Sequence, residues 1–539
     1  MPALVRRPTV AAVAMAVSGA LVLSGCTSDP DPELTGPTAS ESSASATPSE
    51  PTTAEPTGDL DASFAAQAVV KRAVVGTREV EFAVGPIVTE GETSVLPIRA
   101  KDVSAAPAGD AVRIHVLWGG LRPGAHGVRL LDAEAGTVEE TAEGPGPLYT
   151  TGSLDVTAEE LPMFVVFGAQ TAPALDVLVP LAGLVADVPV VGADQAPEAV
   201  LAARAELVPD GTPVTARVAS LDSFAVALDG ASDTRVTDEE ITVNIDADVL
   251  FAVDKADISR RADGALRAAA RQFEDYEGGT LTVVGHTDDV GEADYNQELS
   301  ERRAEAVRAR LDELVDLDQF TVEVEGRGED EPRASGTSAQ ARSLNRRVEI
   351  VLESATAPAS MAATQDDGGL GASEGPTAPG AEGVTLEGSD GTEVRVSLAE
   401  VRRRAGLLVG EVQVSHVAGD VRGIGSWFAM GGGEDLRGAF KPSQQYTPAN
   451  LTLVAGDQRY YPLDYQRVGE EAGSGGWPLT DLNVSGPLPE SGSYTFTAVW
   501  PDVSGGAPTV TLDVVNPLTE RTYRELRPPF RLTDVAIAN

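Results

Sequence analysis

The sequence predicts a multidomain protein in which a central α/β sandwich is flanked by two mainly-β sandwich domains. Its 539 residues are more than one hydrophobic core normally serves. Residues 239–354 alternate strand and helix periodicity, whereas 64–235 and 389–539 carry short β-branched runs between Gly and Pro turns. Stretches rich in Ser, Thr, Pro, Ala and Gly at 26–63 and 355–388 are predicted to be a disordered tether and a flexible linker.

The composition excludes several classes of partner. Acidic residues outnumber basic ones by 83 to 40, which gives a formal net charge of −43. So acidic a surface repels nucleic-acid phosphates and anionic lipid headgroups, so we expect neither as a general partner. One cysteine and four scattered histidines offer no ligand set for a structural zinc. We therefore expect no metal, no cofactor and no nucleic acid.

Residues 1–25 are predicted to be an export signal. Arg6 and Arg7 precede an apolar run at 10–23, and these 14 residues are too few for a bilayer core that needs about 20. The run ends in Leu-Ser-Gly followed by Cys26. This ending resembles the lipobox of bacterial lipoproteins, which implies that Cys26 carries fatty acyl chains such as palmitate. An ordinary secretory signal with a chance cysteine is the alternative.

The two outer regions carry β patterns without a catalytic constellation. The first has apolar runs at 80–84, 112–118, 163–167 and 175–179, and the third at 393–398, 407–414, 451–454, 494–499 and 509–515. On pattern alone the third resembles the immunoglobulin-like (Ig-like) modules often appended to bacterial lipoproteins. We expect both regions to act as spacers or to contact protein partners.

The central region has the order β-α-β-α-β, then a loop and a final strand. Its expected strands lie at 241–245, 281–284, 320–324 and 348–352, and its expected helices at 259–276 and 296–314. Strands separated by helices predict an α/β sandwich with the helices on one face.

One charge lies where the second helix should be apolar. With Leu299 set at 0° on a helical wheel, Arg303 falls at about 40°, inside the apolar stripe. A guanidinium is costly to bury without an anion, and Asp288 closes the preceding strand. The pair would bind a zwitterion such as an α-amino-acid head, or would form an internal salt bridge that only joins loop to helix. Arg310, at about 20°, shows that one such arginine is weak evidence, because a long side chain can reach water.

The central region also carries short motifs in a fixed order. They are Leu-Phe at 250–251, Lys-Ala at 255–256, Gly-His-Thr-Asp at 285–288, Gly291, Tyr-Asn at 295–296, Leu-Ser-Glu-Arg-Arg-Ala at 299–304, Val307, Gly-Arg-Gly-Glu at 326–329, Pro332 and Asn-Arg-Arg-Val-Glu at 345–349. Together they resemble the OmpA C-terminal-like domain, the family of OmpA, MotB and Pal, over about 115 residues.

The resemblance implies non-covalent binding of peptidoglycan through the diaminopimelate residue of its stem peptide. The family's two main ligand contacts fall on Asp288, for the ligand ammonium, and Arg303, for its carboxylate, 15 residues apart. The residues implied to line the pocket are Asn296, Asp254 and one of Arg346 and Arg347. This chain departs from the family in having Ala252 after the opening Phe251, with Asp254 two positions further on.

We therefore expect a non-enzymatic lipoprotein of the cell envelope, anchored in the membrane and facing the cell wall outside the cytoplasm. In the alternative, it is a surface adhesin or assembly scaffold whose β-domains bind protein partners, and the central domain only docks it to the wall. A wall hydrolase is a further rival, because His286, Asp288 and Ser300 invite a catalytic-triad interpretation.

Overall fold

The computed structural model describes part of the chain in detail. The described residues are 62–105, 111–114, 124–259, 262–273, 276, 278–353, 370–429, 434–435, 437–439, 446–467, 476–481, 484, 486–515 and 528–539. All of them belong to one compact unit, Pro56–Asn539. The predicted export signal, Cys26 and almost all of the predicted tether lie outside the described residues. Within the described residues, no helix combines the length and the apolar character needed to cross a membrane.

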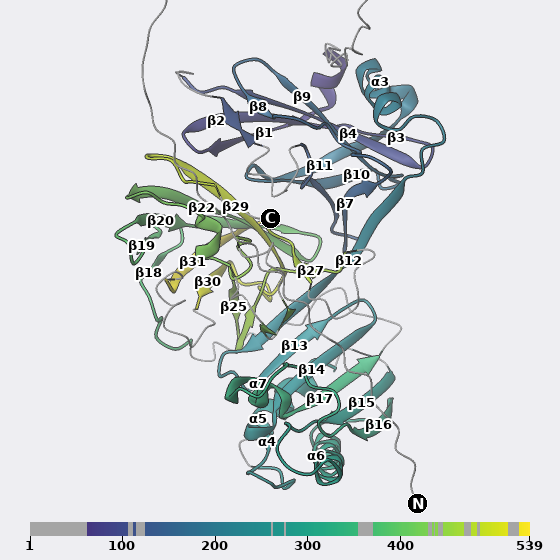
Figure 1. The fold of residues 1–539 in the computed structure, drawn as a ribbon, viewed down its shortest axis with the longest axis vertical. Coiled ribbons are helices and arrows are strands. Elements are labelled where there is room, and N and C mark those ends of the chain that lie inside the picture. Colours follow the sequence, from purple (N-terminus) through teal and green to yellow (C-terminus); the bar gives the residue numbers. More distant parts are fainter. Residues whose placement is uncertain are drawn as a thin grey trace, which may run out of the picture. The chain divides into compact units, whose positions relative to one another are not determined.

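The central region forms a mixed sheet with the strand order β13–β14–β17–β15–β16 (Figure 1). Their bounds are β13 (Ser232–Val236), β14 (Glu240–Asp246), β17 (Arg347–Glu353), β15 (Gly279–Gly285) and β16 (Phe320–Gly326). Neighbours are antiparallel except β15 and β16, which are parallel. Because parallel neighbours need a crossover, helix α6 (Ala293–Leu314) connects them.

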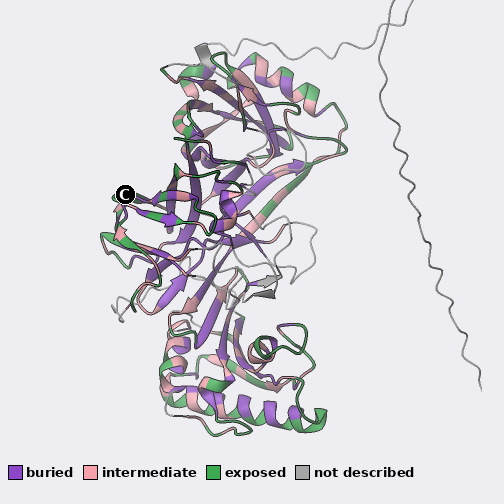
Figure 2. Ribbon diagram, turned by 60° about the vertical axis from the view of Figure 1, so that its left-hand side comes forward, coloured by how far each residue is buried: buried purple, intermediate pink, exposed green. Residues whose placement is uncertain are grey.

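Helices α5 (Ala262–Arg271) and α6 pack on one face of this sheet. In the core, Leu266 of α5 and Val307 of α6 pack with Leu281 of β15 and Ile350 of β17. Side chains along a strand alternate between the two faces of a sheet, and these two lie on the face that the helices cover. Figure 2 shows the buried sheet residues in purple and the solvent side of α6 largely in green. The predicted α/β arrangement is confirmed for this region.

Three elements of the central region are absent from the prediction. Strand β13 adds to the sheet before residue 239, and the short helices α4 (Ala247–Leu250) and α7 (Ala339–Asn345) lie where loops were expected. Ser338 caps α7, since its side chain accepts a hydrogen bond from the Ala341 backbone N–H. Elements this short show no measurable periodicity, so the pattern could not reveal them.

The first region is mainly antiparallel strands. Its elements are α1 (Ala62–Gln67), β1 (Val69–Val75), β2 (Arg78–Val84), β3 (Ile87–Glu90), β4 (Thr93–Asp102), β5 (Val112–Arg113), β6 (Arg129–Asp132), β7 (Thr137–Glu143), β8 (Asp155–Val156), β9 (Leu161–Gly168), β10 (Ala174–Val179), β11 (Gly183–Gly192), a 3-10 turn (Ala193–Gln195), α3 (Glu198–Leu207) and β12 (Thr215–Ala227). The strands predicted at 80–84, 163–167 and 175–179 are confirmed. Most of the strand predicted at 112–118 lies outside the described residues.

The third region is also strand-rich. Its elements are β18 (Thr377–Pro379), β19 (Val384–Glu387), β20 (Glu393–Ser397), β21 (Glu400–Arg404), β22 (Leu407–Ala418), a 3-10 turn (Ile424–Trp427), β23 (Glu434–Asp435), β24 (Gly438–Ala439), β25 (Leu453–Ala455), β26 (Gln458–Tyr460), β27 (Asp464–Tyr465), β28 (Trp477–Pro478), β29 (Ser493–Pro501), β30 (Thr509–Val514) and β31 (Phe530–Ala538). The strands predicted here are present, while the Ig-like architecture stays a prediction.

The regions are joined more closely than the predicted linker suggests. Strand β12 pairs with β7 of the first region, with β26 and β27 of the third, and with β13 of the central sheet. Residues of the first and third regions also share one hydrophobic cluster. Strands β18 and β19 lie inside the stretch predicted as linker to 388, so that stretch ends before Thr377. The Gly- and Ala-rich composition of this stretch did not indicate its two strands, because they are stabilised by backbone pairing: β18 with β31 and β19 with β20.

Candidate functional site

Helix α6 lies unusually close to the ends of β15 and β16 because both strands end in glycine. A Cβ atom at Gly285 would lie 2.1 Å from the Ser300 carbonyl oxygen, and one at Gly326 would lie 2.6 Å from Ser300 Oγ. Ser300 Oγ also accepts a hydrogen bond from the Gly328 N–H at 3.0 Å. The glycines and the serine of the motifs therefore bring the first turns of α6 onto the strand ends.

This close approach places Arg303 in a nearly buried position without a counter-charge. The residue is 5% exposed, its Nε donates to the Lys255 carbonyl oxygen at 3.0 Å, and its guanidinium carbon lies 5.2 Å from the centre of the Phe251 ring. Within the described part of the chain, no carboxylate lies within ion-pair distance of it. Burial lowers the pKa of the guanidinium, which Asp248 and Asp254 partly offset by their charge.

Asp288 pairs with a different arginine from the one that its spacing suggested. Its Oδ2 lies 2.8 Å from Arg346 Nη1, and its Oδ1 accepts the Val290 N–H at 3.2 Å. Arg346 also holds Asp248 with two hydrogen bonds, of 2.7 and 3.2 Å. The hydrogen bonds that Arg346 donates to both carboxylates raise its pKa, most of all those to Asp248. The internal Asp288–Arg303 salt bridge, which was the alternative to a ligand-binding pair, is therefore not formed.

Asn296 positions the loop that carries Asp288. It is 3% exposed, and its Nδ2 lies 3.3 Å from the carbonyl oxygens of Asp288 and Val290. The same nitrogen lies 2.8 Å from Glu329 Oε2. These hydrogen bonds from a buried amide hold the loop in place, so Asn296 positions Asp288.

The other predicted lining residues divide between the site and its surroundings. Of the two arginines, Arg346 lies at Asp288, whereas Arg347 is buried beside Glu349, with Nη2 2.8 Å from Glu349 Oε1. Asp254 is exposed, with a left-handed φ of 56°, in the turn that supplies the Lys255 carbonyl to Arg303. The structure thus brings Asp288, Arg303, Arg346, Asn296 and Asp254 together and leaves Arg347 out.

Two contributors were missed by the sequence analysis. Asp248 shares Arg346 with Asp288, and Glu329 anchors Asn296. Neither lies in a periodic pattern; Glu329 belongs to the Gly-Arg-Gly-Glu motif, which was the available signal. Helix α7 ends directly before Arg346. Arg342, on the same helix, donates hydrogen bonds of 2.6 and 3.2 Å to Asp289.

The residues of the proposed triad have separate partners. His286 Nε2 lies 3.4 Å from Glu349 Oε2, Ser300 Oγ donates to the Gln297 carbonyl oxygen at 2.8 Å, and Asp288 pairs with Arg346. In the described residues, no group of three potential ligands could hold a metal ion.

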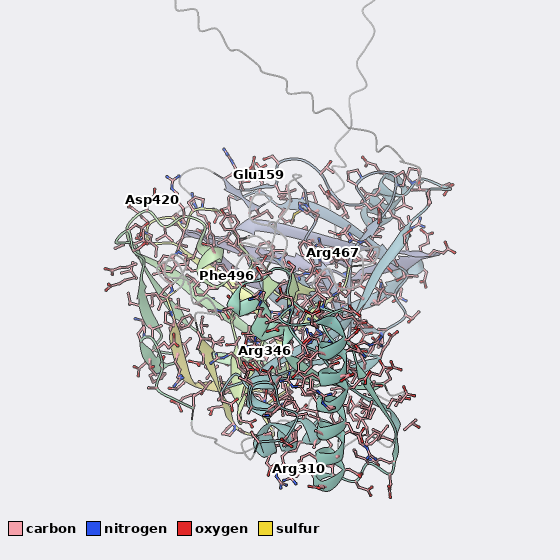
Figure 3. The ribbon with its side chains drawn as sticks, turned by 60° about the horizontal axis from the view of Figure 1, so that its bottom comes forward. Glu159, Arg310, Arg346, Asp420, Arg467 and Phe496 are labelled. Carbon is pink, nitrogen blue, oxygen red and sulfur yellow. The ribbon has the colours of Figure 1, made fainter. Side chains whose placement is uncertain are left out.

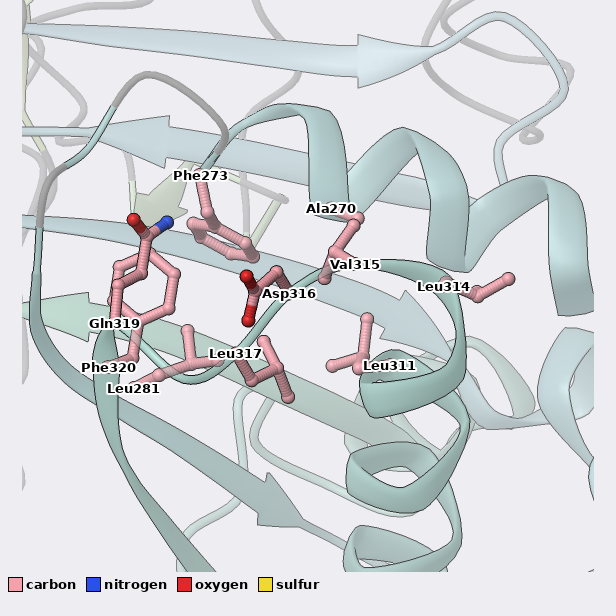
Figure 4. A pocket seen from close by; sticks show the side chains of 10 residues that line it. All are labelled: Ala270, Phe273, Leu281, Leu311, Leu314, Val315, Asp316, Leu317, Gln319 and Phe320. Carbon is pink, nitrogen blue, oxygen red and sulfur yellow. The ribbon is translucent and has the colours of Figure 1, made fainter.

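A cavity of about 300 Å³ lies at the other end of the central domain (Figure 4). Its lining is apolar except for Asp316 and Gln319, and it includes Leu281, near the start of β15, and Leu311, near the end of α6. Asp288 follows the opposite end of β15, so the cavity is separate from the charged site. Figure 3 labels Arg346 at that site and Arg310, which pairs with Asp263, further along α6.

Fold and site together define an α/β module with a small charged site beyond the end of β15. The model of the OmpA family matches residues 250–346. The outer-membrane lipoprotein YfiB of Pseudomonas aeruginosa is 32% identical over 133 residues, which cover 25% of this chain and 77% of that protein. The chain belongs to the OmpA family.

Other similar proteins also match only part of the chain. Outer membrane porin F of Pseudomonas aeruginosa is 39% identical over 111 residues, covering 21% of this chain and 32% of porin F. The chain spans 56% of outer membrane protein A of Bordetella avium. The solved peptidoglycan-associated lipoprotein from Burkholderia pseudomallei is 29% identical and covers 20% of this chain and 88% of that one, with a TM-score of 0.18.

The glycine contacts yield a matched pair of substitutions. Gly285→Ala should lower the free energy of unfolding by about 1–3 kcal/mol, because its Cβ meets the α6 backbone. Gly264→Ala on the exposed side of α5 has open space and should raise it by about 0.5–1 kcal/mol. Denaturant unfolding of both variants measures the difference, and equal effects would contradict the close approach of α6.

Proposed function

We propose that this protein binds peptidoglycan non-covalently through its OmpA-family region. Arg303 binds the carboxylate of the stem-peptide diamino acid, such as diaminopimelate, and Asp288 binds the ammonium group of the same residue. The observation that carries the proposal is the nearly buried Arg303 guanidinium, which the surrounding residues hold in place but do not neutralise. Membership of the OmpA family supports the choice of ligand.

The chemistry of the site fits a zwitterion. The terminal nitrogens of Arg303 offer a fork to a carboxylate, while Asp288 and Asp254 supply negative charge for an ammonium group. Each charge-assisted hydrogen bond is worth about 1.5–3 kcal/mol net, so two or three of them give a weak to moderate affinity. The wall is a repeating polymer, so a high effective concentration of sites compensates for weak individual contacts.

The proposal extends to a membrane anchor. Acylation of Cys26 would hold one end of the chain in a membrane while the central domain grips the wall, which makes the protein a bridge within the cell envelope. The resemblance of the Cys26 segment to a lipobox supports this, as does the similarity to a protein named an outer-membrane lipoprotein. In this proposal the protein is a structural link and not an enzyme.

The binding site can be tested by co-sedimentation with insoluble peptidoglycan. The chain from residue 27 onward should be retained, and Arg303→Met should bind about 10–100-fold more weakly, because one or two charge-assisted bonds are lost. The matched control is Arg310→Met, seven residues later on the same helix, which should be retained like the wild type.

Thermal unfolding separates lost binding from lost folding. Removing a nearly buried cation without a counter-charge should leave the unfolding midpoint of Arg303→Met unchanged or higher. Equal retention of the wild type, Arg303→Met and Asp288→Asn would refute the assigned pocket.

The anchor has its own test. When it is expressed with residues 1–25, the wild type should partition into the detergent phase of a cell extract, because several acyl chains together anchor a protein firmly in a membrane. Cys26→Ser should move to the aqueous phase. Detergent partition that does not depend on Cys26 would contradict lipidation there.

A further inference from the structure

Strand β12 is the element at which the three regions meet (Figure 1). Its first half pairs with β7 of the first region, Leu221 and Asp222 pair with β27 of the third, and residues 223–226 pair with β13 of the central sheet. Residues 225–227 also pair with β26 of the third region. Because β13 and β26 pair with some of the same residues, they lie on opposite edges of β12. The third region therefore covers the edge of β12 that the central sheet leaves open.

Two carboxylates face each other where β12 meets β27. Asp222 of β12 is directly opposite Asp464 of β27, so the two side chains lie on the same face of the antiparallel pair, with Cβ atoms about 5 Å apart. Both residues are buried, with exposed fractions of 7% and 1%. Like charges directly opposite each other destabilise strand pairing, so the two carboxylates need counter-charges or a proton.

The neighbouring arginines compensate the two carboxylates unequally. Arg437 donates to both carboxylate oxygens of Asp464, with Nε 2.9 Å from Oδ2. Arg235 of β13 has its Nη1 3.6 Å from Asp222 Oδ2, which is beyond hydrogen-bond distance, and its Nη2 donates to the Arg437 carbonyl oxygen. Asp464 therefore has a hydrogen-bonded counter-charge, whereas Arg235 makes only a loose ion pair with Asp222.

The surroundings of Asp222 favour its uncharged form. Burial raises the pKa of its carboxyl to about 7; Arg235 opposes this shift, and the negative charges of Asp464, Asp238 and Glu240 add to it. Since the ordinary pKa is 3.8, the closed junction holds a proton between pH 4 and pH 7 that an opened junction would release. The stabilisation from this proton is complete below pH 4 and is lost as the pH rises through 7.

We propose that the carboxylate pair Asp222–Asp464 is a pH-sensitive switch at the junction of the three regions. When Asp222 releases its proton to solvent, two negative charges face each other across the strand pair, and β26 and β27 loosen from β12. Strands β7 and β13 keep their own pairing with β12, so the first region and the central domain stay joined. The switch changes how firmly the third region is attached, whatever the central domain binds.

Hydrogen exchange of peptides that cover β26 and β27 tests the switch in the chain from residue 27 onward. After correction for the intrinsic pH dependence of exchange, the opening constant of these strands should rise about tenfold from pH 6 to pH 8, because a carboxyl with a pKa of about 7 releases its proton over this range. In Asp222→Asn, which keeps the shape of the protonated carboxyl, the rise should be at most about twofold. Asp481 accounts for this remainder, because burial raises its pKa to about 6.

The matched control is Asp457→Asn, which removes a half-exposed carboxylate directly before β26 and should keep the wild-type pH dependence. In a second variant, Arg235→Gln, loss of the opposing charge should move the midpoint of the rise to higher pH. An equal wild-type opening constant at pH 6 and pH 8 would overturn the inference, and so would a tenfold rise that survives in Asp222→Asn. If Asp222→Asn does not fold, Arg235→Gln decides, and an unchanged or lower midpoint contradicts the switch.

Discussion

The proposed site depends on one constraint, the free-energy cost of burying the Arg303 guanidinium without a counter-charge. Removing an unpaired charge from water costs of order several kcal/mol, and a fold keeps such a group only where something compensates. Gly285 and Gly326 draw α6 onto the strand ends, and that approach carries Arg303 into the interior edge of the domain. The Lys255 carbonyl and the Phe251 ring hold the guanidinium in place without neutralising it. A bound anion would supply the negative charge that the protein does not place beside this guanidinium.

The neighbouring carboxylates are fixed by partners of their own, which makes the site preorganised. Arg346 links Asp248 to Asp288, and Asn296 holds the loop of Asp288 against Glu329. Because these contacts already exist without ligand, binding does not need to order the loop first, and less affinity is lost to conformational entropy. Asp288 pairs with Arg346 and not with Arg303, so the Arg303 guanidinium and the Asp288 carboxylate do not neutralise each other.

Much of the central domain could be predicted from periodicity, because β14, β15, β16, β17, α5 and α6 are long enough to show it. The misfit of Arg303 on the apolar stripe of α6 was visible for the same reason. The partner of Asp288 was not, because Arg346 lies 58 positions away on a segment without a pattern. Helix α7 is too short to register, and the linker prediction failed where β18 and β19 rely on backbone pairing. The close association of the first and third regions through β12 depends on long-range pairing that composition does not encode.

The most direct measurement is a crystal structure of the chain from residue 27 onward with a bound muropeptide fragment that contains the diamino acid. The ligand carboxylate should lie within hydrogen-bond distance of the Arg303 terminal nitrogens, and its ammonium group should lie beside Asp288. A complex in which Arg303 has closed onto Asp254 or Asp248, with the fragment bound elsewhere, would contradict the role of the uncompensated guanidinium as the receptor for the wall.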